Sequence, residues 1–180
     1  MKEELLNIVE SELFYGIDVG VMPVNETSDS ITKIPTYTGN IDPRVIRINN
    51  GRKWHEPFDI DIHRFELVPH KTDMVDFLDT KELKEKYYKE LKTLVKHHVR
   101  ASNVHIFDYT LRTGDDEKRK KELLREPVKR VHNDYTEWSG PQRVRDLFPK
   151  EAEKLISRRF SIIQVWRPIQ KTLEKDPLAL

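Results

Sequence analysis

The chain has 180 residues and no cysteine, so we expect one domain with its own core and exclude disulfide frameworks, zinc ribbons, iron–sulfur clusters and thiol nucleophiles. Its 32 Lys and Arg residues balance 31 Asp and Glu residues, so net charge indicates neither a nucleic-acid partner nor an anionic membrane. No apolar run approaches the roughly 20 residues of a membrane helix, and two acids, Glu3 and Glu4, stand where a signal peptide would have its basic region. We therefore expect a cytoplasmic protein.

The N-terminal third of the chain changes character near residue 20. Apolar residues at helical spacing, with Ile8, Val9 and Leu13 on one face, predict a short amphipathic helix over residues 1–13. From 20 to 57, prolines and glycines interrupt short apolar pieces, which predicts loops and edge strands.

The firmest secondary-structure prediction is a helix over residues 80–99. Asp79 is a suitable N-cap, and Glu82 stands where it would complete a capping box. Apolar residues then recur every three to four positions while Lys and Glu fill the other face, so one side of this helix is expected to be buried. His97 and His98 lie near its C-terminus, where a cation suits the helix dipole, and we interpret this pair as structural.

Three later segments are rich in β-branched and aromatic residues and predict strands: residues 104–111, 127–136 and 159–167. A charged excursion with about one helical turn separates the first two, and helix-start signals near Ser139 and Pro149 precede the third. Strands separated by long excursions predict an α+β fold with an antiparallel sheet or barrel rather than a regular βαβ series.

The chemical candidate is the pair His132 and Asp134. Residues i and i+2 of an extended chain share one face, so the imidazole and the carboxylate could hold one ion. They would supply two of the three ligands of a 2-His-1-carboxylate triad, which binds non-haem Fe(II). With seven histidines and 31 acids in 180 residues, about one histidine should have an acid two positions later by chance. The pair alone therefore does not identify a site. Without its context, a surface strand pair is the commoner interpretation.

The sequence around this pair resembles that of one protein family. Residues 131–136 (Val-His-Asn-Asp-Tyr-Thr), 165–169 (Val-Trp-Arg-Pro-Ile) and 176–180 (Asp-Pro-Leu-Ala-Leu) are its most specific parts, and residues 63–67 (His-Arg-Phe-Glu-Leu) agree in order. Together they resemble the fungal hydroxylase/desaturase family that includes gibberellin desaturase-like and cephem methoxylase-like proteins. The resemblance covers residues 43–180, which we expect to form the oxygenase-like domain, and leaves 1–42 as an extension.

The resemblance implies a double-stranded β-helix, or jelly-roll, with N-terminal amphipathic helices. It further implies a mononuclear Fe(II)- and 2-oxoglutarate-dependent hydroxylase or desaturase of a small specialised metabolite, with His132 and Asp134 as iron ligands. Arg167 and Arg112, the latter at a strand end, are candidates for binding the carboxylate of the oxo acid. His105 is interpreted as a packed histidine rather than a substitute third ligand.

Family members continue beyond the Pro-Leu-Ala-Leu block and supply a second histidine ligand there, whereas no histidine follows His132 in this sequence. We therefore expect a fragment or truncated product whose barrel is incomplete and whose oxygenase activity is impaired. An uncovered sheet edge could also pair with a second copy of the chain. The alternative prediction is accordingly a non-catalytic remnant that forms a homodimer or an interaction module.

Overall fold

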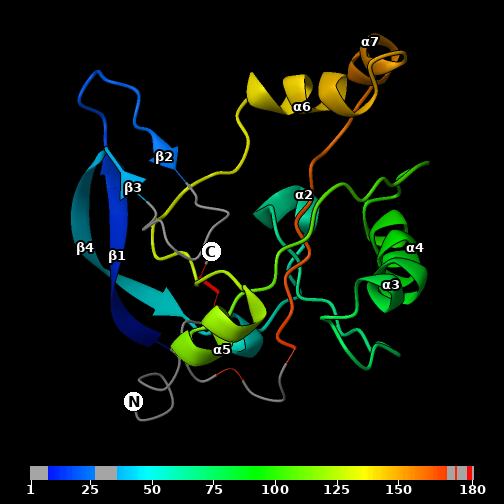
Figure 1. Ribbon diagram of the computed structural model, residues 1–180. Coiled ribbons are helices and arrows are strands. Elements are labelled where there is room, and N and C mark those ends of the chain that lie inside the picture. The colour runs from blue at the N-terminus through cyan, green and yellow to red at the C-terminus, as the bar shows by residue number, and fades with distance from the viewer. Residues whose placement is uncertain (1–7, 27–35, 170–172, 174–177, 180) are drawn as a thin grey trace. The chain divides into compact units, whose positions relative to one another are not determined.

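The computed structural model describes residues 8–26, 36–169, 173 and 178–179 (Figure 1). It divides the chain into two compact units where composition predicts one. The first unit comprises Met1–Asn50, Tyr109–Phe160 and Leu173–Leu180, and the second comprises Gly51–Asp108 and Ser161–Thr172. The chain crosses between the units more than once, so neither unit is a continuous segment.

The first unit is built on a two-stranded antiparallel ribbon of β1 (Ile8–Ile17) and β4 (Asn40–Asn49). Their register pairs Val9 with Ile48 and Phe14 with Pro43. Pro43 has no N–H to donate, and it is tolerated because a strand of a two-stranded ribbon has a free edge. The predicted boundary at residue 42 lies inside β4.

The prediction of an N-terminal helix over residues 1–13 is wrong where it can be checked, because residues 8–13 belong to β1; residues 1–7 lie outside the described part. Helical spacing of a few apolar residues does not exclude a strand. Here pairing with a segment more than thirty residues away decides the conformation. Between residues 20 and 57, where loops and edge strands are expected, β4 confirms a strand.

The second unit contains the predicted helix, which is confirmed over residues 80–98 as three consecutive pieces. These are α3 (Thr80–Glu82), a π-helical turn η2 (Leu83–Tyr87) and α4 (Tyr88–His98). Asp79 caps it as predicted, since its Oδ1 accepts from the backbone N–H groups of Lys81 and Glu82. The Glu82 carboxylate, however, accepts from the N–H of Asp76 rather than closing a capping box on Asp79.

The remaining elements are short. They comprise β2 (Asn25–Glu26), β3 (Thr36–Tyr37), η1 (Gly51–Lys53), α2 (Ile60–His63), α5 (Asp116–Glu122), α6 (Ser139–Leu147) and α7 (Ala152–Ile156). The two helices predicted from Ser139 and Pro149 are confirmed as α6 and α7. The helical turn expected in the charged excursion is α5, whose N-cap is Asp115.

The three segments predicted as strands are not paired into a sheet. Residues 104–111 and 159–167 carry no ladder, and residues 127–136 make a single isolated bridge, between Arg130 and Phe14. A strand needs a hydrogen-bonded neighbour, and among the described residues none of these segments has one along its length. The described sheets are the β1–β4 and β2–β3 pairs, so a closed jelly-roll is not present among them.

Burial is concentrated in few places. In the described part of the chain, the apolar residues with less than a tenth of their surface exposed are Leu83, Tyr87 and Ala152. Leu83 and Tyr87 lie at the two ends of η2 and give the helix its buried face, as its sequence pattern predicts. No helix formed by the described residues is long and apolar enough to cross a bilayer.

Candidate metal centre

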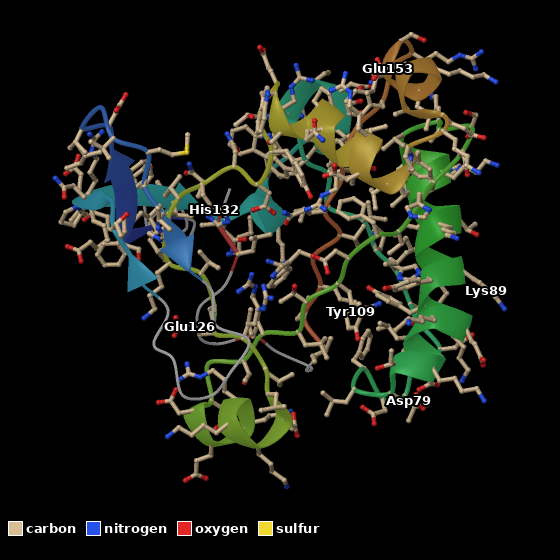
Figure 2. The ribbon with its side chains drawn as sticks, turned by 45° about the horizontal axis from the view of Figure 1, so that its top comes forward. Asp79, Lys89, Tyr109, Glu126, His132 and Glu153 are labelled. Carbon is tan, nitrogen blue, oxygen red and sulfur yellow. The ribbon has the colours of Figure 1, made fainter. Side chains whose placement is uncertain are left out.

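The segment that carries His132 and Asp134 lies against the ribbon of the first unit (Figure 2). Arg130 forms a parallel bridge with Phe14, and the backbone N–H of Val131 donates to the carbonyl of Phe14 at 2.9 Å. These contacts fix the backbone immediately before His132. The ribbon therefore positions the first predicted ligand although residues 127–136 form no regular strand.

The helix α6 fixes the backbone on the other side. The Oγ of Ser139 accepts from the backbone N–H of Thr136 at 2.9 Å, and the Ser139 N–H donates to Thr136 Oγ1 at 3.1 Å. This reciprocal pair caps the start of α6. The Nε of Arg143, one helical turn further on, donates to the hydroxyl of Tyr135 at 3.2 Å. The two residues after Asp134 are thus held by the helix that follows them.

The structure brings the two predicted ligands together. His132 Nε2 lies 3.2 Å from Asp134 Oδ1, and both side chains are accessible, with 50% and 40% of their surface exposed. The other ring nitrogen, Nδ1, lies 2.7 Å from the backbone carbonyl of Arg130. In the neutral imidazole this contact requires a proton on Nδ1, because a carbonyl oxygen can only accept. Nε2 then carries the lone pair and faces the carboxylate.

A lone pair 3.2 Å from a carboxylate oxygen gives two acceptors that face each other, and a cation bound to both would stabilise them. A divalent metal ion is such a cation. Ligand nitrogen and oxygen atoms lie about 2.1 Å from such an ion, so two ligands at a right angle around it lie about 3 Å apart. The observed separation fits that arrangement. The Nδ1 contact to a backbone carbonyl is also the usual outer partner of a metal-bound histidine.

Of the two predicted arginines, Arg112 belongs to the same unit as this pair. It stands at the base of the charged excursion, bridged to Arg125, and its Nη1 donates to the carbonyl of Glu126 at 2.8 Å. Burial lowers the pKa of the Arg112 guanidinium and the neighbouring Arg125 lowers it further, while the Asp134 carboxylate opposes both. The Asp134 carboxylate therefore lies close enough to Arg112 to favour the charged form of its guanidinium.

Arg167 belongs to the second unit, where it forms a cluster with other side chains. Its Nη1 donates to His70 Nδ1 at 3.4 Å, and its guanidinium carbon lies 5.6 Å from the ring centre of Tyr87 and 5.8 Å from that of Phe77. Burial raises the pKa of the Tyr87 hydroxyl, an effect that Arg167 opposes. The Arg167 Nε is buried without a hydrogen-bond partner among the described residues.

A third metal ligand is not found in the part of the chain that the structure describes, where no three His, Asp or Glu side chains converge on one point. Sequence reasoning found the pair by its spacing, but missed the contacts that support it. The Arg130 carbonyl and the capping pair Thr136 and Ser139 act through the backbone, which carries no side-chain signature. The approach of Arg112 to Asp134 joins residues 22 positions apart and has no local signal.

Comparison with known proteins assigns the class. Residues 14–180 match the family described as an oxidoreductase/YMDC permease-like domain, and the chain belongs to this family.

Among curated relatives, the hydroxylase/desaturase CTB9 of Cercospora beticola is 31% identical over 151 residues, covering 77% of this chain and 46% of that protein. The Fe(II)/2-oxoglutarate-dependent dioxygenase nvfI of Aspergillus novofumigatus is 28% identical over 180 residues, covering 95% of this chain and 63% of that protein. The predicted kinship with fungal hydroxylase/desaturases is confirmed. The chain spans about half the length of the curated relatives it matches.

Solved structures agree on the fold. The iron and alpha-ketoglutarate-dependent endoperoxidase NvfI, in one of its conformations, superposes with a TM-score of 0.63 at 21% identity. The match covers 84% of this chain and 56% of that chain. At this identity the likeness establishes a shared fold and nothing more. It therefore confirms the predicted fold class only as far as the fold shared with that protein.

Proposed function

We propose that this chain supplies the first two metal ligands of a mononuclear Fe(II)- and 2-oxoglutarate-dependent oxygenase, which hydroxylates or desaturates a small specialised metabolite. The observation that carries the proposal is the convergence of His132 Nε2 and Asp134 Oδ1 at 3.2 Å in a chain of this family. With dioxygen as the oxidant, bound iron and 2-oxoglutarate would supply the oxidation of a C–H bond, with succinate and carbon dioxide as co-products. The finer features of the predicted fold, a double-stranded β-helix incomplete in this chain, are part of the same proposal.

The hydrogen bonds around the two ligands hold them in place for a metal ion. The Arg130 carbonyl holds the proton of His132 on Nδ1, so Nε2 can coordinate without first losing one. The capped start of α6 holds the backbone that follows Asp134 and thereby limits the positions its carboxylate can take. Two ligands hold a divalent ion weakly, so the affinity of this chain alone is expected to be low.

Arg112 is the proposed partner of the oxo-acid carboxylate at this site, because it lies in the same unit as the ligands and within electrostatic reach of Asp134. Arg167 is the second candidate, since its buried Nε–H has no hydrogen-bond partner among the residues that the structure describes. A guanidinium can hold a carboxylate through two parallel hydrogen bonds. The Arg112→Lys variant should weaken metal-dependent binding of 2-oxoglutarate more than Arg167→Lys, and the reverse order would reassign the role.

Mn(II) titration followed by electron paramagnetic resonance tests the metal site directly, because bound ion leaves the free-ion signal. The parent should bind one Mn(II), and His132→Ala and Asp134→Ala should each abolish the binding. The matched control is His55→Ala, which removes another exposed histidine beside an acid, Glu56, and should leave binding unchanged. Equal binding by the parent and both site variants would remove the basis of the proposal.

The second predicted function, a self-associating remnant, has no support from the comparisons or from the described residues and stays a prediction. Sedimentation velocity over a range of concentrations measures it. A concentration-independent monomer would exclude the homodimer.

A further inference from the structure

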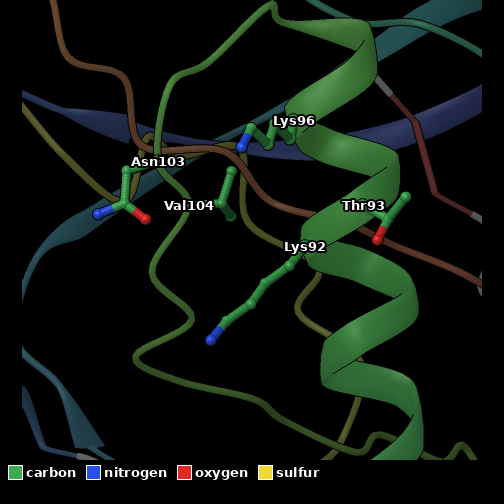
Figure 3. Close-up of a pocket in the computed structure, with 5 residues that line it drawn as sticks. All are labelled: Lys92, Thr93, Lys96, Asn103 and Val104. Carbon is green, nitrogen blue, oxygen red and sulfur yellow. The ribbon is translucent and has the colours of Figure 1, made fainter.

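The second unit contains a shallow hollow between α4 and the segment that follows it. Its volume is about 200 Å³, and it is lined by Lys92, Thr93 and Lys96 from α4 and by Asn103 and Val104 from the returning chain (Figure 3). Figure 3 shows Lys92 and Lys96 extending from the helix on the side where Asn103 and Val104 lie. The hollow is lined by other residues than the proposed metal centre and contains no acidic side chain.

The end of α4 explains why the two walls face each other. Arg100 adopts a left-handed conformation with φ of 51°, and the N–H of Ala101 donates to the carbonyl of Lys96 at 3.2 Å. This is the hydrogen bond of a Schellman ending, in which one left-handed residue reverses the chain direction. The reversal brings residues 103 and 104 back beside the last turns of the helix.

The hollow is unusually basic. Residues 91–104 contain Lys92, Lys96 and Arg100 but no Asp or Glu, although 31 acids in 180 residues would place about two in a stretch of that length. Lys92 and Lys96 are both exposed, and neither forms an ion pair with another described residue. Since they are four positions apart on a helix, their side chains leave the same face one turn apart and repel each other.

Helix polarity explains only one of these lysines. A cation stabilises the C-terminal end of a helix, but the effect is confined to the last turn. Lys96 lies in the last turn of α4, which ends at His98, whereas Lys92 lies almost two turns before that end. The helix dipole thus does not account for Lys92 beside Lys96, and an anion bound between the two lysines would turn their repulsion into attraction.

The donors in the hollow favour a phosphate group. Lys92, Lys96 and the amide of Asn103 are available to donate, whereas the Thr93 hydroxyl already donates to the Lys89 carbonyl at 3.1 Å. A phosphate group carries about two negative charges at neutral pH and three terminal oxygens, which match two ammonium groups and one amide. A single carboxylate would leave one cation unpaired.

From this arrangement we propose that the hollow formed by Lys92, Lys96 and Asn103 is a binding site for a phosphate group of a small molecule. The site is independent of the metal centre in its residues and needs no metal. Its failure would therefore leave the proposed oxygenase function untouched, and failure of the latter would leave this site untouched.

Calorimetric titration with inorganic phosphate, without metal and at low ionic strength, tests the proposal. The parent should bind one phosphate saturably, and the double variant Lys92→Gln/Lys96→Gln should bind it roughly tenfold or more weakly, as expected for loss of two charged donors. The matched control Lys84→Gln/Lys89→Gln removes two exposed lysines of the same helical segment outside the hollow and should change binding less than about twofold.

Two further outcomes decide the matter. Asn103→Leu should weaken phosphate binding without changing net charge, which separates a built site from general attraction. Equal weakening by the two lysine double variants, or binding by the parent that does not saturate, would overturn the proposal. Far-ultraviolet circular dichroism of each variant checks that α4 is intact, so that loss of binding reports on the site.

Discussion

Two regions of the molecule each place a histidine beside a carboxylate, and they do so in different ways. In the second unit, His98 Nδ1 lies 2.8 Å from Glu66 Oε1, and both side chains are only 26% exposed. In the first unit, His132 Nε2 lies 3.2 Å from Asp134 Oδ1, and both are about half exposed. The distances alone would rank the His98 pair as the better site.

The surroundings reverse that ranking. Glu66 and His98 are 32 positions apart and join the end of α4 to an earlier segment, so their contact ties the unit together. His132 and Asp134 are two positions apart, so their contact ties together nothing that the backbone does not already join. The His132 pair is accessible and adds little to the fold, and its Nδ1 is held by the Arg130 carbonyl. Such a pair is suited to bind an ion. To tell a metal-binding pair from a structural one, the partner of the histidine's other ring nitrogen and the exposure of both side chains are therefore more informative than the distance between them.

The largest expected effect concerns the second unit, whose role in this comparison is structural. Removing the packing on which that unit depends should therefore destabilise it strongly. Leu83 is 2% exposed, so Leu83→Ala should lower the free energy of unfolding by about 2–4 kcal/mol through lost burial and a cavity. Urea denaturation measures the change. Leu78→Ala, at a position 44% exposed, is the control and should cost under about 1 kcal/mol. Similar costs for both would mean that η2 does not anchor the unit.

The two histidines themselves provide the next test. His98→Ala leaves the carboxylate of Glu66 partly buried without its partner, and should lower the free energy of unfolding by about 1–2 kcal/mol. His132→Ala, at an exposed position, should change it by less than about 0.5 kcal/mol. A double-mutant cycle of His98→Ala with Glu66→Ala isolates the pair. A larger cost at His132 than at His98 would contradict the assignment of structural and ligand roles.

The start of α6 carries the support of the proposed metal centre and can be weakened by itself. Thr136→Val removes the oxygen that accepts from the Ser139 N–H, and loss of such a cap should cost about 1 kcal/mol of unfolding free energy. It should also weaken Mn(II) binding, because the backbone after Asp134 is less restrained. Thr93→Val is the matched control, since its hydroxyl bonds only within α4. Unchanged metal binding in Thr136→Val would show that the cap does not position Asp134.

The smallest expected effect is a pH dependence in the helix of the second unit. The hydrogen bond from Lys86, at 2.6 Å, and the N–H of Asp76 lower the pKa of Glu82 below its ordinary value of 4.5. A carboxylate with a lowered pKa in the folded state contributes stability above pH 4.5, and this contribution is lost as the pH falls through the folded value. Glu82→Gln should therefore be less stable than the parent at pH 7, with the difference vanishing in acid.

Urea denaturation at a series of pH values follows this difference. The control Glu85→Gln removes an exposed carboxylate from the adjacent η2 turn and should not reproduce the convergence. A difference that grows as the pH falls would contradict the sign of the pKa shift.

Prediction from the sequence succeeded where structure is local. The helix over residues 80–98 follows from its own cap and apolar spacing, and the approach of His132 to Asp134 follows from their separation of two. The N-terminal helix failed because residues 8–13 are committed by pairing with β4, which no local pattern reports. The grouping of Arg112 with the ligand pair, and of Arg167 with the other unit, likewise depends on contacts between distant residues.

The π-helical turn between Leu83 and Tyr87 has a consequence for how related sequences should be aligned. Such a turn accommodates one more residue than an α-helical turn, and each residue advances the helix by about 100°. A relative lacking one residue at this point could close the helix regularly, but every side chain on the N-terminal side of the deletion would rotate by that angle against the rest. In an alignment with relatives, a gap of one residue is therefore best placed between Leu83 and Tyr87. Because the residues before the gap rotate, such relatives should also differ at the cap position of Asp79.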